Sequence, residues 1–130
     1  VFGPNLGIIS DVGASWFVPN LIGRARANGM GLLGEDISAK QAKEWGLIWD
    51  CVPDEELISK AEEIAKKLAN GPITGLKEIV KAHDKALSGS LSEQLDYEKE
   101  TQRIRLDSKD FREGVTAFAE KRKPNFKDLD

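Results

Sequence analysis

The chain has few of the side chains that build disulfide frameworks and metal centres. Its 130 residues include one cysteine, Cys51, and one histidine, His83. A single cysteine excludes an internal disulfide and a cysteine-based zinc cluster, and a single histidine argues against a histidine-based metal site. We therefore expect no metal site, a Cys51 thiol buried as a small apolar side chain, and a solvated His83.

The sequence also lacks a strong excess of charge and a long apolar run. The 19 lysines and arginines against 22 aspartates and glutamates give a net charge of −3. This balance gives no electrostatic reason to expect a nucleic acid or an anionic membrane as partner. No apolar run approaches the roughly 18–20 residues of a membrane span. The chain starts at Val1 without the features of a secretory signal, so we expect a processed N-terminus or a fragment.

Few segments are typical of β-strands. Residues 1–9 read as a short strand or loop, and residues 47–52 as a short strand or extended segment, but neither has an evident partner strand. Apolar residues at helical spacing and capping signals predict helices elsewhere. The predicted helices cover residues 11–22, 24–33, 39–45, 53–68, 73–87, 92–106 and a last segment capped by Ser108. Their apolar faces suggest a helical layer that covers a surface outside this chain.

Asp11 is the first candidate functional residue. It lies between an apolar segment and a turn that contains Gly13. A carboxylate in an apolar cleft can acquire a raised pKa and shuttle protons. Aspartate is also a preferred N-cap residue, so Asp11 or Ser10 could instead cap the helix that follows. The residues alone leave both interpretations open, with the cap the commoner case.

Other candidates also have ordinary structural interpretations. The pair Trp16 and Phe17 could line an apolar ligand pocket, although core packing is the more frequent role of such side chains. A cationic cluster near the C-terminus could bind phosphate or could simply favour the end of a helix. Its members are Lys121, Arg122, Lys123 and Lys127.

Three stretches together carry a family resemblance: residues 6–16, residues 34–49 and residues 111–126. The last of them, E-G-x-x-A-F-x-E-K-R-x-P-x-F, is the most specific. In order and spacing the chain resembles the C-terminal half of the crotonase superfamily, the enoyl-CoA hydratases and isomerases. The resemblance implies an α+β, ClpP/crotonase-like fold. Residues 1–50 would form the end of the spiral core, with a short β-strand and the active-site helix, and residues 51–130 the helical trimerisation region.

Within this family the sequence most resembles the phenylacetate-pathway isomerases, which act on ring-epoxidised phenylacetyl-CoA. The segment from Asp11 to Pro19 carries this likeness. Hydratases of the family use two glutamates, and the second lies eight residues before the position of Asp11. That position is Gly3 here. The missing carboxylate favours an isomerase over a hydratase, with Asp11 as the acid/base.

The resemblance also implies a mechanism and partners. Asp11 would be catalytic, and Trp16, Phe118 and Lys121 would bind substrate, with Phe118 facing the acyl pocket and Lys121 approaching the CoA phosphates. The substrate would be an acyl-CoA thioester, no further cofactor would be needed, and the enolate would be held by backbone N–H groups of an N-terminal half that this chain lacks. The protein would be a cytoplasmic homotrimer or dimer of trimers that binds neither nucleic acid nor membrane.

Three alternatives remain open. The protein could be an enoyl-CoA hydratase, or a crotonase-like protein that binds CoA thioesters as a non-catalytic assembly scaffold. An independent helical module is the third. In the isomerase interpretation, the chain alone holds one acid/base and part of a CoA-binding surface, so we expect it to be inactive by itself.

Overall fold

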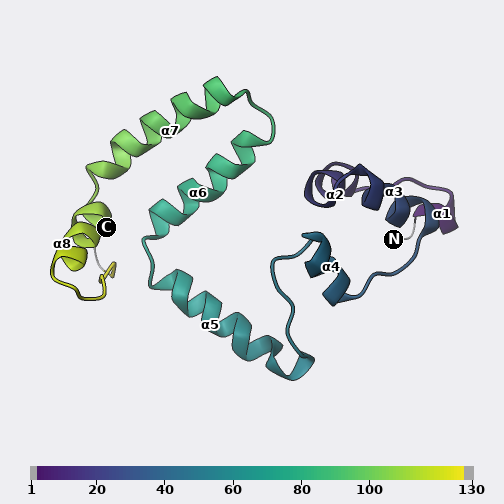
Figure 1. The fold of residues 1–130 in the computed structure, drawn as a ribbon, viewed down its shortest axis with the longest axis horizontal. Helices are drawn as coiled ribbons and strands as arrows, with labels where there is room; N and C mark the ends of the chain where they lie inside the picture. The colour runs from purple at the N-terminus through teal and green to yellow at the C-terminus, as the bar shows by residue number, and fades with distance from the viewer. Residues whose placement is uncertain (1–2, 128–130) are drawn as a thin grey trace. The chain divides into compact units, whose positions relative to one another are not determined.

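A computed structural model describes residues 3–127 of the chain. The contacts within it divide the chain into two compact units, Val1–Leu57 and Ile58–Asp130. Each unit is described by itself. All regular secondary structure in the described residues is helical (Figure 1).

The first unit is organised around two helices in contact. Its elements are α1 (Gly3–Leu6), α2 (Ala14–Ile22), α3 (Arg24–Leu33), α4 (Ala39–Trp45) and the one-turn 3-10 helix η1 (Asp54–Glu56). Helix α2 packs against α3, which α1 also contacts. The single residue Gly23 joins α2 to α3 with φ 80° and ψ 156°, a conformation that is essentially restricted to glycine. This corner allows two consecutive helices to pack on each other.

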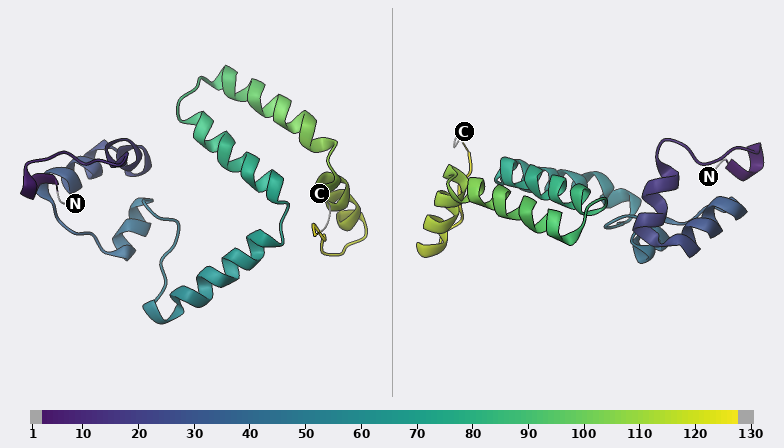
Figure 2. Two further views of the ribbon diagram at one scale, coloured as in Figure 1. Left: turned by 180° about the vertical axis from the view of Figure 1, so that it is seen from behind. Right: turned by 90° about the horizontal axis from the view of Figure 1, so that it is seen from above.

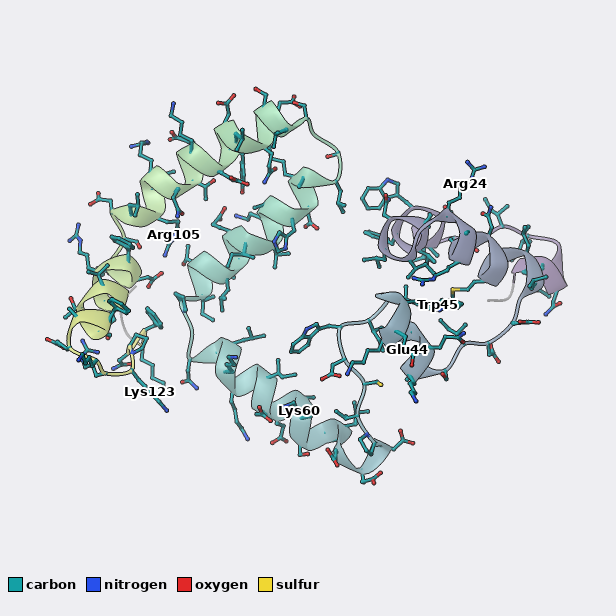
Figure 3. All side chains as sticks on the ribbon, viewed as in Figure 1. Arg24, Glu44, Trp45, Lys60, Arg105 and Lys123 are labelled. Atoms are coloured by element: carbon teal, nitrogen blue, oxygen red, sulfur yellow. The ribbon has the colours of Figure 1, made fainter. Side chains whose placement is uncertain are left out.

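Helix α4 is connected to α3 through Trp45, which lies at its C-terminal end (Figure 3). The Arg26 guanidinium donates to the Trp45 carbonyl at 3.4 Å, and its carbon lies 5.5 Å from the centroid of the indole ring. The second distance is typical of a cation–π interaction. At the start of α4 the Ser38 hydroxyl accepts the Gln41 N–H at 3.1 Å, as the capping signal predicts.

The second unit is built around a helical hairpin. Its helices are α5 (Leu57–Ala69), α6 (Ile73–Ala86), α7 (Leu91–Leu106) and α8 (Lys109–Ala119). Helices α6 and α7 lie side by side in Figure 1 and in both views of Figure 2. The Tyr97 hydroxyl donates to Glu78 Oε2 at 3.1 Å, and Gln94 Nε2 donates to the Ala82 carbonyl at 3.2 Å. These bonds join the two helices of the hairpin.

Serine caps define the starts of α7 and α8 in the second unit. A capping box between Ser90 and Glu93 begins α7, and the Ser108 hydroxyl accepts the Phe111 N–H at the start of α8. An ion pair between Arg105 and Asp110 then connects α7 to α8 at the junction where Figure 3 labels Arg105. The helices predicted from the sequence in this unit are confirmed, with bounds shifted by a residue or two except at the start of α5, which begins at Leu57 and not at residue 53 because a 3-10 turn (Asp54–Glu56) precedes it.

The short β-strands that were one alternative for residues 1–9 and 47–52 are not confirmed within the described residues. Residues 3–6 form the short helix α1, and residues 46–52 form a turn, bends and irregular backbone. Val1 and Phe2, which belong to the first expected strand, lie outside the described residues. A strand needs a neighbour to pair its backbone groups, and residues 3–127 contain no other strand.

Few apolar side chains are buried. Among the described residues the buried apolar side chains are Ile22, Ala42 and Ala117. Many leucines, isoleucines and aromatic residues on the helices are exposed, as the amphipathic patterns predict for faces without a partner. In the part of the chain that the structure describes, no helix combines the length and the apolar character that crossing a membrane requires.

Candidate functional site

Asp11 lies in a tight turn immediately before α2. Its carbonyl accepts the Ala14 N–H at 2.9 Å, and the two residues between them, Val12 and Gly13, have φ of 52° and 80°. Two central residues with positive φ are characteristic of a type I′ turn. The N-cap of α2 is Gly13, and no side chain caps this helix. The interpretation of Asp11 or Ser10 as a helix cap is therefore wrong, because the turn moves both residues ahead of the cap position.

Val12 occupies an unfavourable conformation beside Asp11. A β-branched residue with positive φ is a genuine outlier, and the left-handed region costs an L-residue roughly 1–2 kcal/mol. The side chain of Val12 is 94% exposed, so burial of its methyl groups does not offset this cost. Strained backbone is concentrated at active sites and ligand-binding segments. The strain therefore makes this turn a candidate functional feature.

An apolar cavity lies next to the turn. It has a volume of about 420 Å³, is partly open to solvent, and is lined by the segment before Asp11 and by helices α2 and α3. Ser10 and Ala14, which flank the turn, line it together with apolar side chains such as Ile9, Val18 and Met30. Asp11 itself is exposed and does not line the cavity, so the turn places the carboxylate beside the cavity and not inside it.

Trp16 and Phe17 start α2 and contact each other edge to face, with ring centroids 5.0 Å apart. They remain 46% and 55% exposed, so the interpretation of the pair as core residues is wrong for this chain. The Phe17 ring is held instead against Gly13. A Cβ at position 13 would lie 2.9 Å from Phe17 Cε2, closer than real side-chain contacts allow.

We expect Gly13→Ala to destabilise the first unit and to move the Asp11 turn. Alanine would have to adopt a φ of 80°, and its Cβ would displace the Phe17 ring. The left-handed conformation alone costs about 1–2 kcal/mol. Thermal unfolding of the full-length variant would measure the loss. Gly29→Ala in α3 is the matched control, because nothing lies within 4 Å of a Cβ there. Equal stability of the two variants would contradict the expected strain at position 13.

Phe118 and Lys121 occupy one turn at the end of α8. The Lys121 N–H donates to the Phe118 carbonyl at 3.2 Å, and the Arg122 N–H donates to the Ala117 carbonyl at 3.0 Å. These bonds form a Schellman motif, whose left-handed position is usually a glycine. Lys121 holds that position with φ 54°. The Phe118 side chain is 87% exposed, and Lys121 is exposed as well.

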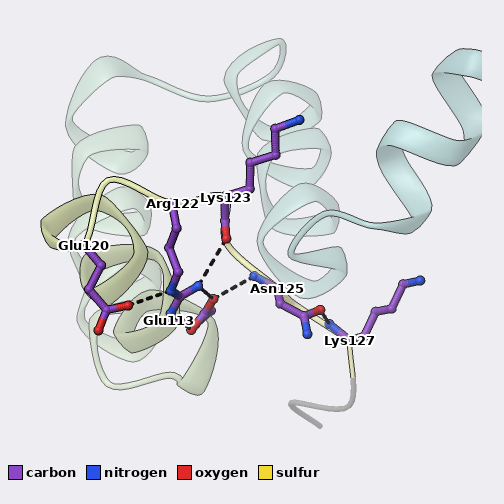
Figure 4. Close-up of polar contacts among 6 residues, drawn as sticks. All are labelled: Glu113, Glu120, Arg122, Lys123, Asn125 and Lys127. Atoms are coloured by element: carbon purple, nitrogen blue, oxygen red, sulfur yellow. Dashed lines mark hydrogen bonds and ion pairs between the residues drawn. The ribbon is translucent and has the colours of Figure 1, made fainter.

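A network of polar contacts closes the C-terminal segment onto α8 (Figure 4). Glu113 accepts from Arg122 Nη1 at 2.6 Å and Nη2 at 3.0 Å, and also accepts the Asn125 N–H at 2.7 Å. Arg122 Nε donates to Glu120 at 2.6 Å, and its Nη1 also reaches the Lys123 carbonyl at 3.1 Å. We call the contacts of Glu113 with Arg122 and Asn125 the Glu113 clasp.

The clasp shifts the ionisation of both charged partners. The hydrogen bonds from Arg122, followed by that from the Asn125 amide, lower the pKa of Glu113 to about 2. The carboxylates of Glu113 and Glu120 raise the pKa of Arg122. Both charges therefore persist at neutral pH. Arg122 thus belongs to an ion pair with Glu113 and is not only a member of the cationic cluster near the C-terminus. The C-terminal motif E-G-x-x-A-F-x-E-K-R-x-P-x-F contains both Glu113 and Arg122, and this was the signal in the sequence that could have linked them.

The predicted site residues thus fall into two groups. Asp11 and Trp16 lie in the first unit, and Phe118 and Lys121 in the second. His83 is exposed on α6, and Cys51 is half-buried in the first unit. Within residues 3–127 no cluster of three or more histidine, cysteine, aspartate or glutamate side chains is arranged to hold a metal ion.

Comparison with known proteins gives consistent matches. The chain is 48% identical over 121 residues to the 1,2-epoxyphenylacetyl-CoA isomerase of Escherichia coli, covering 93% of this chain and 46% of that protein. It is 37% identical over 126 residues to the mitochondrial enoyl-CoA hydratase of Pongo abelii, covering 95% and 42%. The chain therefore spans about half the length of these relatives.

A solved structure and a family description agree. The crystal structure of an enoyl-CoA hydratase from Bacillus anthracis aligns with a TM-score of 0.89 at 36% identity, covering 95% of this chain and 48% of that one. The fold is thus crotonase-like, as the three motifs implied, although the described residues contain no strand. Residues 2–129 match the family described as enoyl-CoA hydratase/isomerase. The chain, with its strained aspartate turn and its C-terminal motif, belongs to the enoyl-CoA hydratase/isomerase family.

Proposed function

We propose that this chain is the C-terminal half of an acyl-CoA isomerase that moves a proton through a thioester enolate, with ring-epoxidised phenylacetyl-CoA as its substrate. The observation that carries the proposal is the position of Asp11. Its carboxylate is not used as a helix cap, and it lies in a strained turn beside an apolar cavity. The 48% identity to a 1,2-epoxyphenylacetyl-CoA isomerase supports the choice of substrate.

The proposed chemistry needs one acid/base residue. Asp11 removes a proton from a carbon near the thioester carbonyl, and the electron pair becomes an enolate. Backbone N–H groups outside this chain hold the oxyanion. The protonated Asp11 then returns the proton to a different carbon, so that no atoms are gained or lost. A single positioned carboxylate can serve both proton transfers, first as base and then as acid.

Three further residues are assigned to substrate binding. Trp16 lines the acyl site near Asp11, and Phe118 contributes an apolar surface that is 87% exposed in this chain. Lys121 binds a CoA phosphate through its exposed ammonium group. No cofactor besides the CoA of the substrate is needed. We assign residues 1–50 to the end of the spiral core and residues 51–130 to a trimerisation region of a cytoplasmic homotrimer or dimer of trimers.

A hydratase is the second candidate, because the chain is 37% identical to a mitochondrial enoyl-CoA hydratase. Water addition in this family uses a second carboxylate, and the corresponding position in this sequence is Gly3. This difference is the reason to prefer the isomerase. A non-catalytic scaffold that only binds CoA thioesters is the third candidate.

One experiment separates the three. The full-length protein is incubated in D₂O with epoxidised phenylacetyl-CoA and with an enoyl-CoA, and the products are followed by NMR. The isomerase is expected to convert the epoxide to its isomer. It should also exchange carbon-bound protons near the thioester without adding water. Formation of a 3-hydroxyacyl-CoA would indicate the hydratase. Binding without exchange or conversion would indicate the scaffold, and either result would overturn the proposal.

A further inference from the structure

Lys121 is held by the backbone bonds of the Schellman motif and also by contacts of the two residues beside it. It occupies a left-handed conformation that disfavours side chains other than glycine, so the local backbone does not select this geometry by itself. The residues on either side of it, Glu120 and Arg122, are joined by a 2.6 Å contact between Nε and Oε2. Lys121 is therefore the tip of a small closed turn.

Glu113 is the anchor of this turn on α8. Its two carboxylate oxygens bind the forked guanidinium of Arg122 at 2.6 and 3.0 Å, a bidentate geometry that fixes orientation as well as distance. One of these oxygens also accepts the Asn125 N–H, so the segment after the turn is held as well. Figure 4 shows these contacts converging on Glu113. The Lys121 side chain takes no part in the clasp and stays exposed.

We infer that Glu113 is a positioning residue for substrate recognition, which holds Arg122 so that the neighbouring Lys121 presents its ammonium group to the phosphates of the CoA thioester. The inference rests on the proposed function, because it assumes that Lys121 binds a CoA phosphate. It assigns to Glu113 a role that requires no contact with substrate. The low pKa of Glu113 is consistent with a clasp whose carboxylate stays ionised at neutral pH.

The test compares two substrates in the full-length protein. One is the CoA thioester, and the other is the pantetheine thioester of the same acyl group, which lacks the phosphates. Glu113→Gln removes the charge of the clasp at similar volume, and Lys121→Met removes the ammonium group. We expect Lys121→Met to raise KM for the CoA thioester about ten- to a hundred-fold, the range for a lost hydrogen bond between charged groups. Glu113→Gln should raise it roughly five- to ten-fold.

Three further results are expected from a positioning role. Glu113→Gln should change neither kcat for the CoA thioester nor KM for the pantetheine thioester. The double variant should resemble Lys121→Met alone, because Glu113 acts through Lys121. Glu100→Gln is the matched control, since Glu100 forms a similar bidentate pair with Arg103 on α7. It should leave both substrates unaffected.

Several outcomes would overturn the inference. Loss of activity on both thioesters in Glu113→Gln, or failure of both Glu113→Gln and Glu113→Asp to fold, would show that the clasp is merely structural. Additive effects in the double variant would show that Glu113 acts independently of Lys121. An unchanged KM for the CoA thioester in Glu113→Gln would remove Glu113 from recognition and leave the proposed function intact. A wild type that does not prefer the CoA thioester would instead contradict the phosphate-binding role assigned to Lys121.

Discussion

Replacement of Asp11 by asparagine is expected to lower kcat for isomerisation by about 10²–10⁴-fold, with little change in KM. General acid–base catalysis by one positioned side chain contributes a factor of this size. The amide cannot accept the substrate proton, yet it has nearly the same shape as the carboxylate. Because Asp11 does not cap α2, the substitution removes no helix cap. Steady-state kinetics of the full-length variant and NMR of proton exchange in D₂O would measure the effect.

A second aspartate of the same unit provides the control. Asp36 is exposed in the loop between α3 and α4, and its replacement by asparagine should leave kcat within about two-fold, as for surface substitutions away from special features. Both variants should retain the unfolding temperature of the wild type. If Asp11→Asn turned over substrate as fast as Asp36→Asn, Asp11 would have no part in proton transfer.

The 130-residue chain expressed alone is expected to lack a cooperative unfolding transition and to associate with itself. The buried apolar side chains of the described residues are Ile22, Ala42 and Ala117, which is too little for an independent core. Large apolar side chains such as Leu91, at 75% exposure, remain in water. Exposed apolar faces of this extent drive association. Calorimetry, dye binding to apolar surface and sedimentation velocity would test the expectation.

The full-length protein provides the comparison for this experiment. It should unfold cooperatively and bind much less of the dye, because additional chain and partner subunits would cover the apolar faces. A compact monomer of 14.3 kDa with a sharp unfolding transition would contradict the expectation. That result would favour an independent helical module.

Local signals were sufficient to place most helices but not their partners. Helices α3 and α4 have the bounds that their sequences predict, since a glycine follows each helix and Ser38 precedes α4. The strand expected over residues 1–9 depended on a pairing partner, which no local pattern can reveal. The role of Glu113 was missed for a similar reason. Its contact with Arg122 joins residues nine positions apart through a reversal of the chain, whereas helix-surface pairs are only three or four apart.

The candidate site was only partly accessible to sequence reasoning. The motifs singled out Asp11 and Lys121, but the choice between a cap and a free carboxylate at Asp11 depended on the turn through Val12. Propensities do not predict valine in that conformation, because it is unfavourable there. Its presence is a departure from local preference, and such departures are expected where function overrides stability.

Within the described residues, Val12 and Lys121 are the non-glycine residues with positive φ, and each adjoins or forms part of the candidate site. Glycine would adopt the positive φ at both positions without the conformational cost that valine and lysine carry there. Substitution of either residue by glycine would therefore be an obvious way to raise the melting temperature of this protein. The same substitution is expected to lower turnover at position 12 or substrate recognition at position 121. The positive φ angles of Val12 and Lys121 therefore mark two positions that a stabilising redesign should leave unchanged.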